Sequence, residues 1–305
     1  MIQDLNVIDF HTHFPSVLPW FPDYDTMKSH NPYGKTDVQS DRWRKAWNFE
    51  PTESAGTDDM QIADRWYAEL EEKGVEKVVF VSGGGNDNLA NVVARHPDKF
   101  IGFAHHHPGI PNAADELERA VTELGMKGYK LLGPAIDTPI NDKSFYPLWE
   151  VAQKHKIPVL IHFGILGAAG GVITHVNMDP LIMQNVAHDF PDVPFVLPHF
   201  GAGYPTQLLH LCWSAPNVYV DSSGSNQWVR WMMPEITLQD LMYKFAQTIG
   251  TNRLLFSTDS SGFPRGLSKP YLEEQHRIAR FLGWSDQQLR EFFSETAESL
   301  LGIKA

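Results

Sequence analysis

The sequence has one cysteine, Cys212, in 305 residues. An intrachain disulfide is therefore excluded, and the redox compartment is left open. The first residues show neither the basic segment nor the long apolar run of a secretory signal peptide. No later window approaches the length of apolar sequence that crosses a membrane. We therefore expect a soluble, cytoplasmic protein that does not contact a membrane.

Positive charge is also in short supply. Lys and Arg number 25 against 37 Asp and Glu, and the formal net charge is −12 at pH 7. A general nucleic-acid surface needs clustered basic residues, so nucleic acid is not an expected partner. Hydrophobic residues make up 42% of the chain, which is enough for a sizeable core. The length suits one large α/β barrel.

Short apolar runs recur along the chain and alternate with helical patterns. Continuous apolar runs are typical of strands that are buried on both faces. This rhythm predicts a (β/α)8 TIM barrel that forms a single domain over residues 1–305. A doubly wound open sheet is the rival, but no Gly-rich dinucleotide fingerprint opens the first helix. The predicted strands cover residues 7–13, 75–81, 100–104, 128–132, 158–162, 194–199, 218–221 and 253–259.

A long insertion, residues 14–75, follows the first strand. It is rich in proline and in aromatic residues, among them Trp20, Phe21, Trp43 and Trp47. Long connections of this kind are often functional. We expect a partly helical lid or a subunit contact that could bury a homodimer interface, and a peripheral decoration is the alternative. The last part shows a helical apolar stripe that ends at Gly74.

Two histidines one residue apart, His11 and His13, end the first strand. Side chains alternate faces along a strand, so both should point the same way. Alone, the pair fits a metal clamp and two solvated side chains equally well. His162, His199 and Asp259 end later predicted strands, and the carboxyl ends of barrel strands share one face. Imidazoles with one carboxylate suit zinc, and also accept manganese, iron or cobalt.

The chain resembles the amidohydrolase superfamily, in the branch that includes aminocarboxymuconate-semialdehyde decarboxylase. The resemblance covers nearly the whole chain and lies in an ordered set of segments. These are Ile8–His13, Gly128–Leu131, Ile157–His162, Leu197–Gly201, Asn217–Ser223, Leu254–Asp259 and Thr296–Gly302.

The resemblance implies a metal site. His11, His13 and His162 would bind one divalent ion, with Asp259 as a further ligand or as the base. His199 would act beside the metal as a general acid or base, or would polarise the substrate. Zinc is the expected ion and manganese the alternative. Lys130 raises a second possibility, because in binuclear relatives a carboxylated lysine bridges two metals.

The resemblance leaves two reactions open for a small carbonyl or carboxylate substrate. In hydrolysis, a metal-activated water attacks a lactone, ester or amide. In non-oxidative decarboxylation, a small aromatic or unsaturated acid loses carbon dioxide. Many decarboxylases of this branch carry a Glu three residues after the sixth-strand histidine, where this chain has Ala202. Hydrolysis is therefore the preferred interpretation, and a catalytically silent binding barrel is a third.

Three further groups are candidates with simpler explanations. His105, His106 and His107 follow the third strand, where one could contact substrate but solvated or capping roles are favoured. Residues 221–223 end the seventh strand, where a helix cap or turn explains them equally well. Arg265 could pair with a substrate carboxylate, although a solvated loop arginine is favoured.

Overall fold

The computed structural model describes residues 5–26, 44–46, 48–53, 58–166 and 174–303. Its parallel strands form two arcs, in the order β1-β2-β3 and β4-β5-β6-β7-β8. The strands are short and largely buried, as their apolar runs predict. They are β1 (Ile8–Thr12), β2 (Lys77–Phe80), β3 (Phe100–Gly102), β4 (Tyr129–Leu132), β5 (Val159–His162), β6 (Phe195–Leu197), β7 (Val218–Asp221) and β8 (Leu254–Leu255).

Backbone bridges join the two arcs into a closed barrel. Ala104, just beyond β3, bridges to Tyr129 of β4. Thr12 of β1 bridges to Ser260, which lies beyond β8. The first strand therefore lies beside the last, and the predicted (β/α)8 barrel is confirmed.

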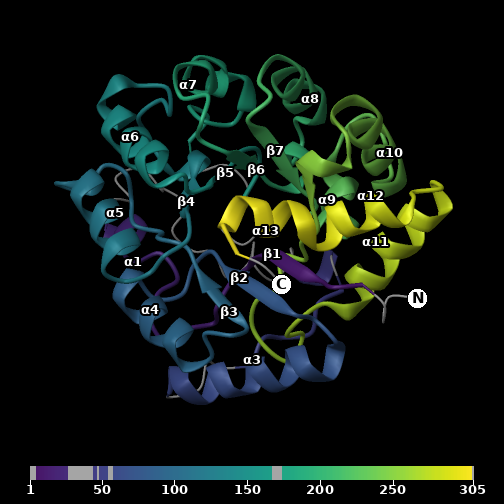
Figure 1. Ribbon diagram of the computed structural model, residues 1–305, viewed down its shortest axis with the longest axis horizontal. Coiled ribbons are helices and arrows are strands. Elements are labelled where there is room, and N and C mark those ends of the chain that lie inside the picture. Colours follow the sequence, from purple (N-terminus) through teal and green to yellow (C-terminus); the bar gives the residue numbers. More distant parts are fainter. Residues whose placement is uncertain (1–4, 27–43, 47, 54–57, 167–173, 304–305) are drawn as a thin grey trace.

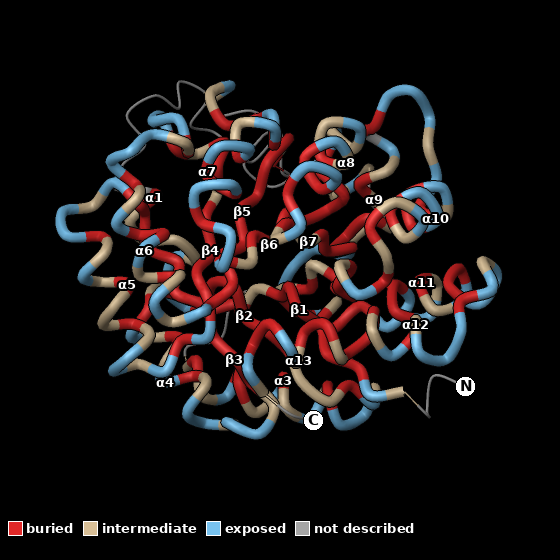
Figure 2. The backbone as a smooth tube through the Cα atoms, turned by 45° about the horizontal axis from the view of Figure 1, so that its top comes forward, coloured by how far each residue is buried: buried red, intermediate tan, exposed pale blue. Residues whose placement is uncertain are grey.

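Helices surround the barrel (Figure 1). Each turns its apolar stripe inward, so that the strands and the inner helix faces are buried while the outer turns are exposed (Figure 2). Thr237 caps α10 with a full capping box. The helices are α1 (Pro22–Thr26), α3 (Asp59–Lys73), α4 (Asn86–Arg95), α5 (Ala113–Thr122), α6 (Tyr146–His155), α7 (Gln184–Asp189), α8 (Pro205–Ser214), α9 (Ser225–Trp228), α10 (Leu238–Ile249), α11 (Lys269–Phe281), α12 (Asp286–Arg290) and α13 (Thr296–Leu301).

The last helix, α13, closes one end of the barrel. Its residues Ala297, Leu300 and Leu301 join the apolar cluster formed by inward-facing strand residues such as Phe10. The helix crosses the front of the barrel in Figure 1. Glu298 of α13 lies close enough to Lys77, the first residue of β2, for the lysine charge to act on the pKa of Glu298. The amino ends of the strands are thus covered, and the carboxyl ends are left for a functional site.

The predicted insertion, residues 14–75, is only partly described. Its last helix is α3, which Gly74 ends in the left-handed conformation, as predicted. Trp66 of α3 is fully buried and packs edge-to-face on Phe80 of β2, so α3 belongs to the outer layer of the barrel. Trp43 and Trp47 lie outside the described residues, and the role of the segment as lid or subunit contact stays a prediction.

The eighth strand is shorter than the sequence predicts. The apolar run predicts an extended segment over residues 253–259, but regular pairing covers only Leu254 and Leu255. Asp259 has a φ of 59°, a left-handed conformation that no β-strand accommodates. Among the described residues, none of the helices combines the length and apolar character that a membrane crossing requires.

Candidate metal centre

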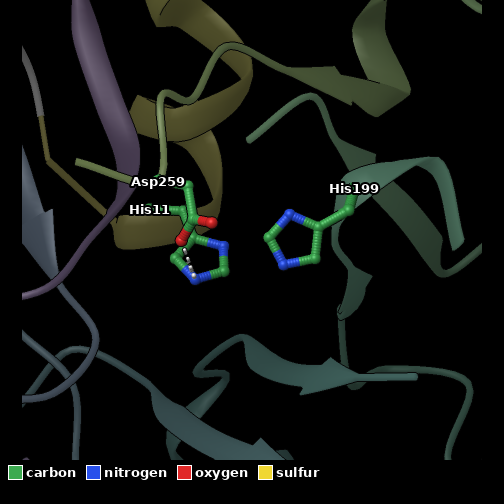
Figure 3. A group of neighbouring side chains, drawn as sticks. All are labelled: His11, His199 and Asp259. Atoms are coloured by element: carbon green, nitrogen blue, oxygen red, sulfur yellow. Dashed lines mark ion pairs between the residues drawn. The ribbon is translucent and has the colours of Figure 1, made fainter. Parts of the chain in front are cut away.

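The five strand-end side chains predicted from the sequence lie together at one end of the barrel. One ligand atom each of His11, His199 and Asp259 lies within 4.8 Å of the others. Figure 3 shows these two rings and the carboxylate pointing toward one another. His13 Nε2 lies 3.3 Å from Asp259 Oδ1, and His162 Nδ1 lies 3.0 Å from His199 Nε2. His199, expected to stand beside the metal, is therefore as central to the group as His11.

A bulge brings His11 into the barrel. The pairing of β1 with β2 shifts register between Asp9 and Thr12, so strict alternation of faces does not hold along the strand. Phe10 packs in the barrel interior, yet the next side chain, His11, also reaches inward, to 3.3 Å from Lys130 Nζ. The sequence predicts the right destination for His11, but not the bulge in β1.

The outer nitrogen of His11 is held by a carboxylate. His11 is fully buried, and its Nδ1 lies 3.0 Å from Asp221 Oδ2. Burial, and then the charge of Lys130, lower the pKa of His11 to about 3. The ring is therefore neutral at pH 7. A carboxylate only accepts, so Nδ1 carries the proton and Nε2 keeps its lone pair toward the site.

His13 lies at the edge of the same group. Its Nδ1 is 2.7 Å from Ser82 Oγ, and burial lowers its pKa. The indole of Trp20 stacks on its ring, with centroids 5.3 Å apart and planes within 7°. A residue of the predicted insertion therefore reaches the site directly.

His162 and His199 face each other through nitrogens that both lack a proton when the rings are neutral. His162 Nε2 lies 2.8 Å from the carbonyl oxygen of Ile165, and His199 Nδ1 lies 2.6 Å from that of Ser223. Carbonyl oxygens only accept, so these outer nitrogens are the donors. The inner nitrogens, 3.0 Å apart, then present two lone pairs to each other. A proton or a cation is needed to make this arrangement favourable.

Asp259 is fixed by its backbone. The amide of Asp259 donates to the carbonyl of His11 at 3.0 Å, and Arg265 Nη2 donates to the carbonyl of Asp259 at 2.7 Å. Burial raises the pKa of Asp259, but the hydrogen bond with His13 and the neighbouring imidazoles outweigh that effect. The pKa is held well below its usual range, so the carboxylate is ionised at neutral pH.

The donor set fits a divalent cation. His11 and His162 turn nitrogen lone pairs inward, and His13 places its Nε2 beside the ionised carboxylate of Asp259. Three or four such ligands are what zinc and manganese take in proteins, and a cation would relieve the opposed lone pairs of His162 and His199. This fit rests on the outer hydrogen bonds, which orient each ring before any ion binds.

Lys130 projects from β4 beside the group. It is 1% exposed, and burial lowers its pKa to about 8. Its Nζ lies 3.3 Å from His11 Nε2, so it occupies space next to the ring that would hold the ion. A carboxylated Lys130 bridging two metals stays the alternative to a single ion.

Asp221 and Ser223 are parts of the site that the sequence left open between a cap, a turn and a functional role. Ser223 Oγ lies 3.0 Å from His11 Nδ1 and 2.9 Å from His199 Nδ1, and it donates a short hydrogen bond to Asp221. Trp228 stacks on His199 with ring centroids 4.9 Å apart. The one sequence signal for Asp221 and Ser223 is their position directly at the end of a predicted strand.

The weaker candidates have structural roles. His105 is 1% exposed rather than solvated. Its Nδ1 lies 3.0 Å from the carbonyl of Phe103, and its Nε2 accepts from the amides of Gly83 and Gly85. It therefore clamps the loop after β2. Arg265 is not a solvated loop arginine either, since its guanidinium lies 4.4 Å over the ring of Phe49.

The barrel, its closed amino end and the ligand cluster at the other end match one family of enzymes. The family model for amidohydrolases matches residues 8–303, and the chain belongs to that family. The expected superfamily is thus confirmed.

Relatives of stated activity extend the comparison. The chain is 24% identical over 234 residues to 2-keto-4-carboxy-3-hexenedioate hydratase of Sphingobium sp., covering 68% of this chain and 67% of that protein. It is 28% identical over 209 residues to γ-resorcylate decarboxylase of Polaromonas sp., covering 57% of this chain and 64% of that protein. The chain thus spans about two thirds of the length of these relatives.

Among solved structures, a similar fold is found in a 5-carboxyvanillate decarboxylase of Novosphingobium aromaticivorans. The TM-score is 0.65 at 16% identity, and the match covers 99% of this chain and 98% of that one. That structure, of the D314N mutant, contains manganese and 3-methoxy-4-hydroxy-5-nitrobenzoic acid.

Proposed function

We propose that this chain is a metal-dependent, non-oxidative decarboxylase of a small aromatic or unsaturated carboxylic acid. The preference for hydrolysis drawn from the sequence gives way, because the similarity to γ-resorcylate and 5-carboxyvanillate decarboxylases favours loss of carbon dioxide. The observation that carries the proposal is the anchored ring of His199. Its Nδ1 is tied to the carbonyl of Ser223, so its Nε2 faces the site.

We assign one divalent ion to His11, His13, His162 and Asp259. When bound, the ion would supply positive charge that holds the substrate's carboxylate and any neighbouring oxygen, and that stabilises negative charge as it develops. Zinc, which the ligand set suits, and manganese, which the Novosphingobium enzyme contains, are the two candidates. Metal analysis of purified protein separates them, and close to two ions per chain would favour the bridged Lys130 arrangement instead.

The chain's own residues account for the proton. Decarboxylation breaks the bond between the carboxylate carbon and the ring or alkene carbon, and that carbon must gain a proton. His199 Nε2 is the inward nitrogen of a ring already fixed by its outer hydrogen bond. With His162 as a ligand of the ion, His199 would carry a second proton on Nε2 as an imidazolium, and it would deliver that proton to the carbon as a general acid and return to the neutral ring.

The walls of the site suit a flat substrate. Trp20 stacks on His13 and Trp228 stacks on His199, with planes 7° and 29° apart. Two indoles stacked on two imidazoles of the site give an apolar, planar lining with a few polar atoms, the pattern of small-molecule sites. This lining supports an aromatic or conjugated acid as the substrate class.

A direct assay tests the proposal. Metal-replete protein is incubated with γ-resorcylate, 5-carboxyvanillate and related hydroxybenzoates in D2O. The expected result is release of carbon dioxide with deuterium at the carbon that lost it. Turnover of lactones or esters without carbon dioxide from any acid would overturn the proposal.

A second reaction has one observation in its favour. The decarboxylase-type Glu after His199 is replaced by Ala202, and the hydratase relative adds water rather than removing carbon dioxide. Asp259, which is ionised and adjacent to the proposed ion, could accept a proton from water in a hydration or hydrolysis. Incorporation of 18O from labelled water into the product, with no carbon dioxide, would identify this reaction.

A further inference from the structure

We infer that Asp221 and Ser223 form one orienting unit that holds the metal-facing ring of His11 and the proton-carrying ring of His199 in a common alignment. Both residues come directly at or after the end of β7, between the strands that supply the two histidines and Asp259. The inference rests on the proposed metal site, but not on which reaction the site performs.

The hydrogen-bond directions around Ser223 are determined by its neighbours. Asp221 is fully buried, and its Oδ1 already accepts the backbone amide of Ser223, so it is the acceptor of this group. The proton of the Ser223 hydroxyl therefore goes to Asp221 Oδ1. The hydroxyl oxygen is left to accept, and the nitrogens within reach are Nδ1 of His11 at 3.0 Å and Nδ1 of His199 at 2.9 Å.

One hydroxyl thus requires the same tautomer of two rings that come from opposite sides of the site. Asp221 Oδ2 takes the proton of His11 Nδ1, and the carbonyl of Ser223 takes that of His199 Nδ1. Both Nε2 atoms then face inward, that of His11 with its lone pair toward the ion and that of His199 as the atom that takes up and gives out the proton. The two imidazole centroids lie 5.2 Å apart. A ring turned by 180° would point a carbon or an N–H at the ion instead.

Asp221 also holds the turn that carries Ser223. Its Oδ1 accepts from the amide of Ser223 at 2.8 Å and lies 3.4 Å from the amide of His199. All of these groups are buried, so water cannot replace a lost partner at low cost. Asp221 and Ser223 are therefore positioning residues that act through the two histidines.

The test measures metal affinity and its spectroscopic signature, not turnover. Metal-free wild type, Asp221→Asn and Ser223→Ala are titrated with Mn²⁺, and the Co²⁺ forms are compared by visible absorption. Partners in the outer layer of a metal site are typically worth about 10- to 100-fold in affinity, so we expect a loss of that order for Asp221→Asn and a smaller one for Ser223→Ala. The Co²⁺ spectrum should change in both, and Ser223→Thr should restore it.

Ser222→Ala is the matched control. Ser222 is equally buried and belongs to the same turn, but its hydroxyl donates to Gln275 on α11, away from the histidines. Its Mn²⁺ affinity and Co²⁺ spectrum should equal those of wild type. If Asp221→Asn does not fold, the Mn²⁺ affinities and Co²⁺ spectra of Ser223→Ala and Ser223→Thr decide the outcome.

The outcomes separate the two levels of the proposal. Wild-type protein that binds no divalent ion would overturn the proposed function. Wild type that binds the ion, with Ser223→Ala retaining full affinity and an unchanged Co²⁺ spectrum, would overturn this inference alone.

Discussion

Gly164 packs directly against the carbonyl oxygen of Ala202, so closely that a Cβ atom on Gly164 would lie 2.3 Å from it. Gly164 follows His162 by two residues, and Ala202 follows His199 by three. The amide of Ile165 also donates to the same carbonyl at 3.3 Å. The two loops that carry the facing histidines are therefore locked together at one point.

Gly164→Ala should separate these loops. The added methyl group cannot be accommodated without moving the Ala202 carbonyl, so we expect loss of metal affinity together with a fall in stability. Gly283→Ala is the control, because Gly283 has a similar φ of +75° against +78°, but a Cβ atom added there would meet no atom within 4 Å. It should cost only the left-handed strain of about 1–2 kcal/mol. Equal effects of the two changes, in chemical denaturation and metal titration, would contradict the role of this contact.

Single substitutions should separate the metal ligand from the proton donor. His162→Ala removes an inward nitrogen, so it should abolish metal binding and turnover together. His199→Asn should keep the ion while turnover falls by about 10²–10⁴-fold, the usual contribution of a general acid. His188→Ala, on the exposed side of α7, should change neither. Metal content and steady-state kinetics measured on the same samples give the comparison, and His199→Asn at full activity would refute its assigned role.

Removing the ion should lower thermal stability as well as activity. An ion that binds only the folded state adds about 2.7 kcal/mol at 100 times its dissociation constant. Chelator-treated protein should therefore melt several degrees lower, and adding back Mn²⁺ or Zn²⁺ should restore both the melting temperature and turnover. Differential scanning calorimetry before and after reloading gives the measurement. An unchanged melting temperature would argue against a structural contribution from the ion.

The buried ring of His105 should make stability depend on pH. Burial lowers its pKa from the usual 6.5 to about 4, so between these values the unfolded chain binds a proton that the folded protein does not. The contribution of His105 to the free energy of unfolding should therefore be fully present above pH 6.5 and should be lost as the pH drops toward 4. One such group contributes a slope of about 1.4 kcal/mol per pH unit. When the free energy of unfolding from urea denaturation is plotted against pH, it should fall less steeply for His105→Gln than for wild type. Equal slopes for the two proteins would exclude the effect.

The barrel and its ligand-bearing strand ends can be predicted because both depend on patterns within short segments of the sequence. Apolar runs ending in His162, His199 or Asp259 combine a buried strand with a polar end, and barrel topology then brings the ends together. Helix α4 is predicted only by the alternation of strands with helices, since its buried stripe consists of little more than Leu89 and Val92 and its first residue follows a glycine without a capping side chain.

The orientation of the rings cannot be predicted, for a different physical reason. The partners of His162 Nε2 and His199 Nδ1 are backbone carbonyls. Every residue has a backbone carbonyl, so no residue type in the sequence indicates these partners. The bulge in β1 also cannot be predicted from the sequence, because it depends on pairing with β2 and not on the residues of β1 alone. Asp221 is visible in the sequence, but its partner His11 lies 210 positions away.

The seam between the first and last strands determines when this site can exist during synthesis. Asp9 and Thr258, which hydrogen-bond across that seam, are 249 positions apart, and the amide of Asp259 is bound to His11. A growing chain therefore carries His11 and His13 through the synthesis of β2 to β8 before their carboxylate partner, Asp259, emerges. We expect chains arrested before β8 to lack high-affinity metal uptake, and ion capture would then mark the moment at which the ring of strands is complete.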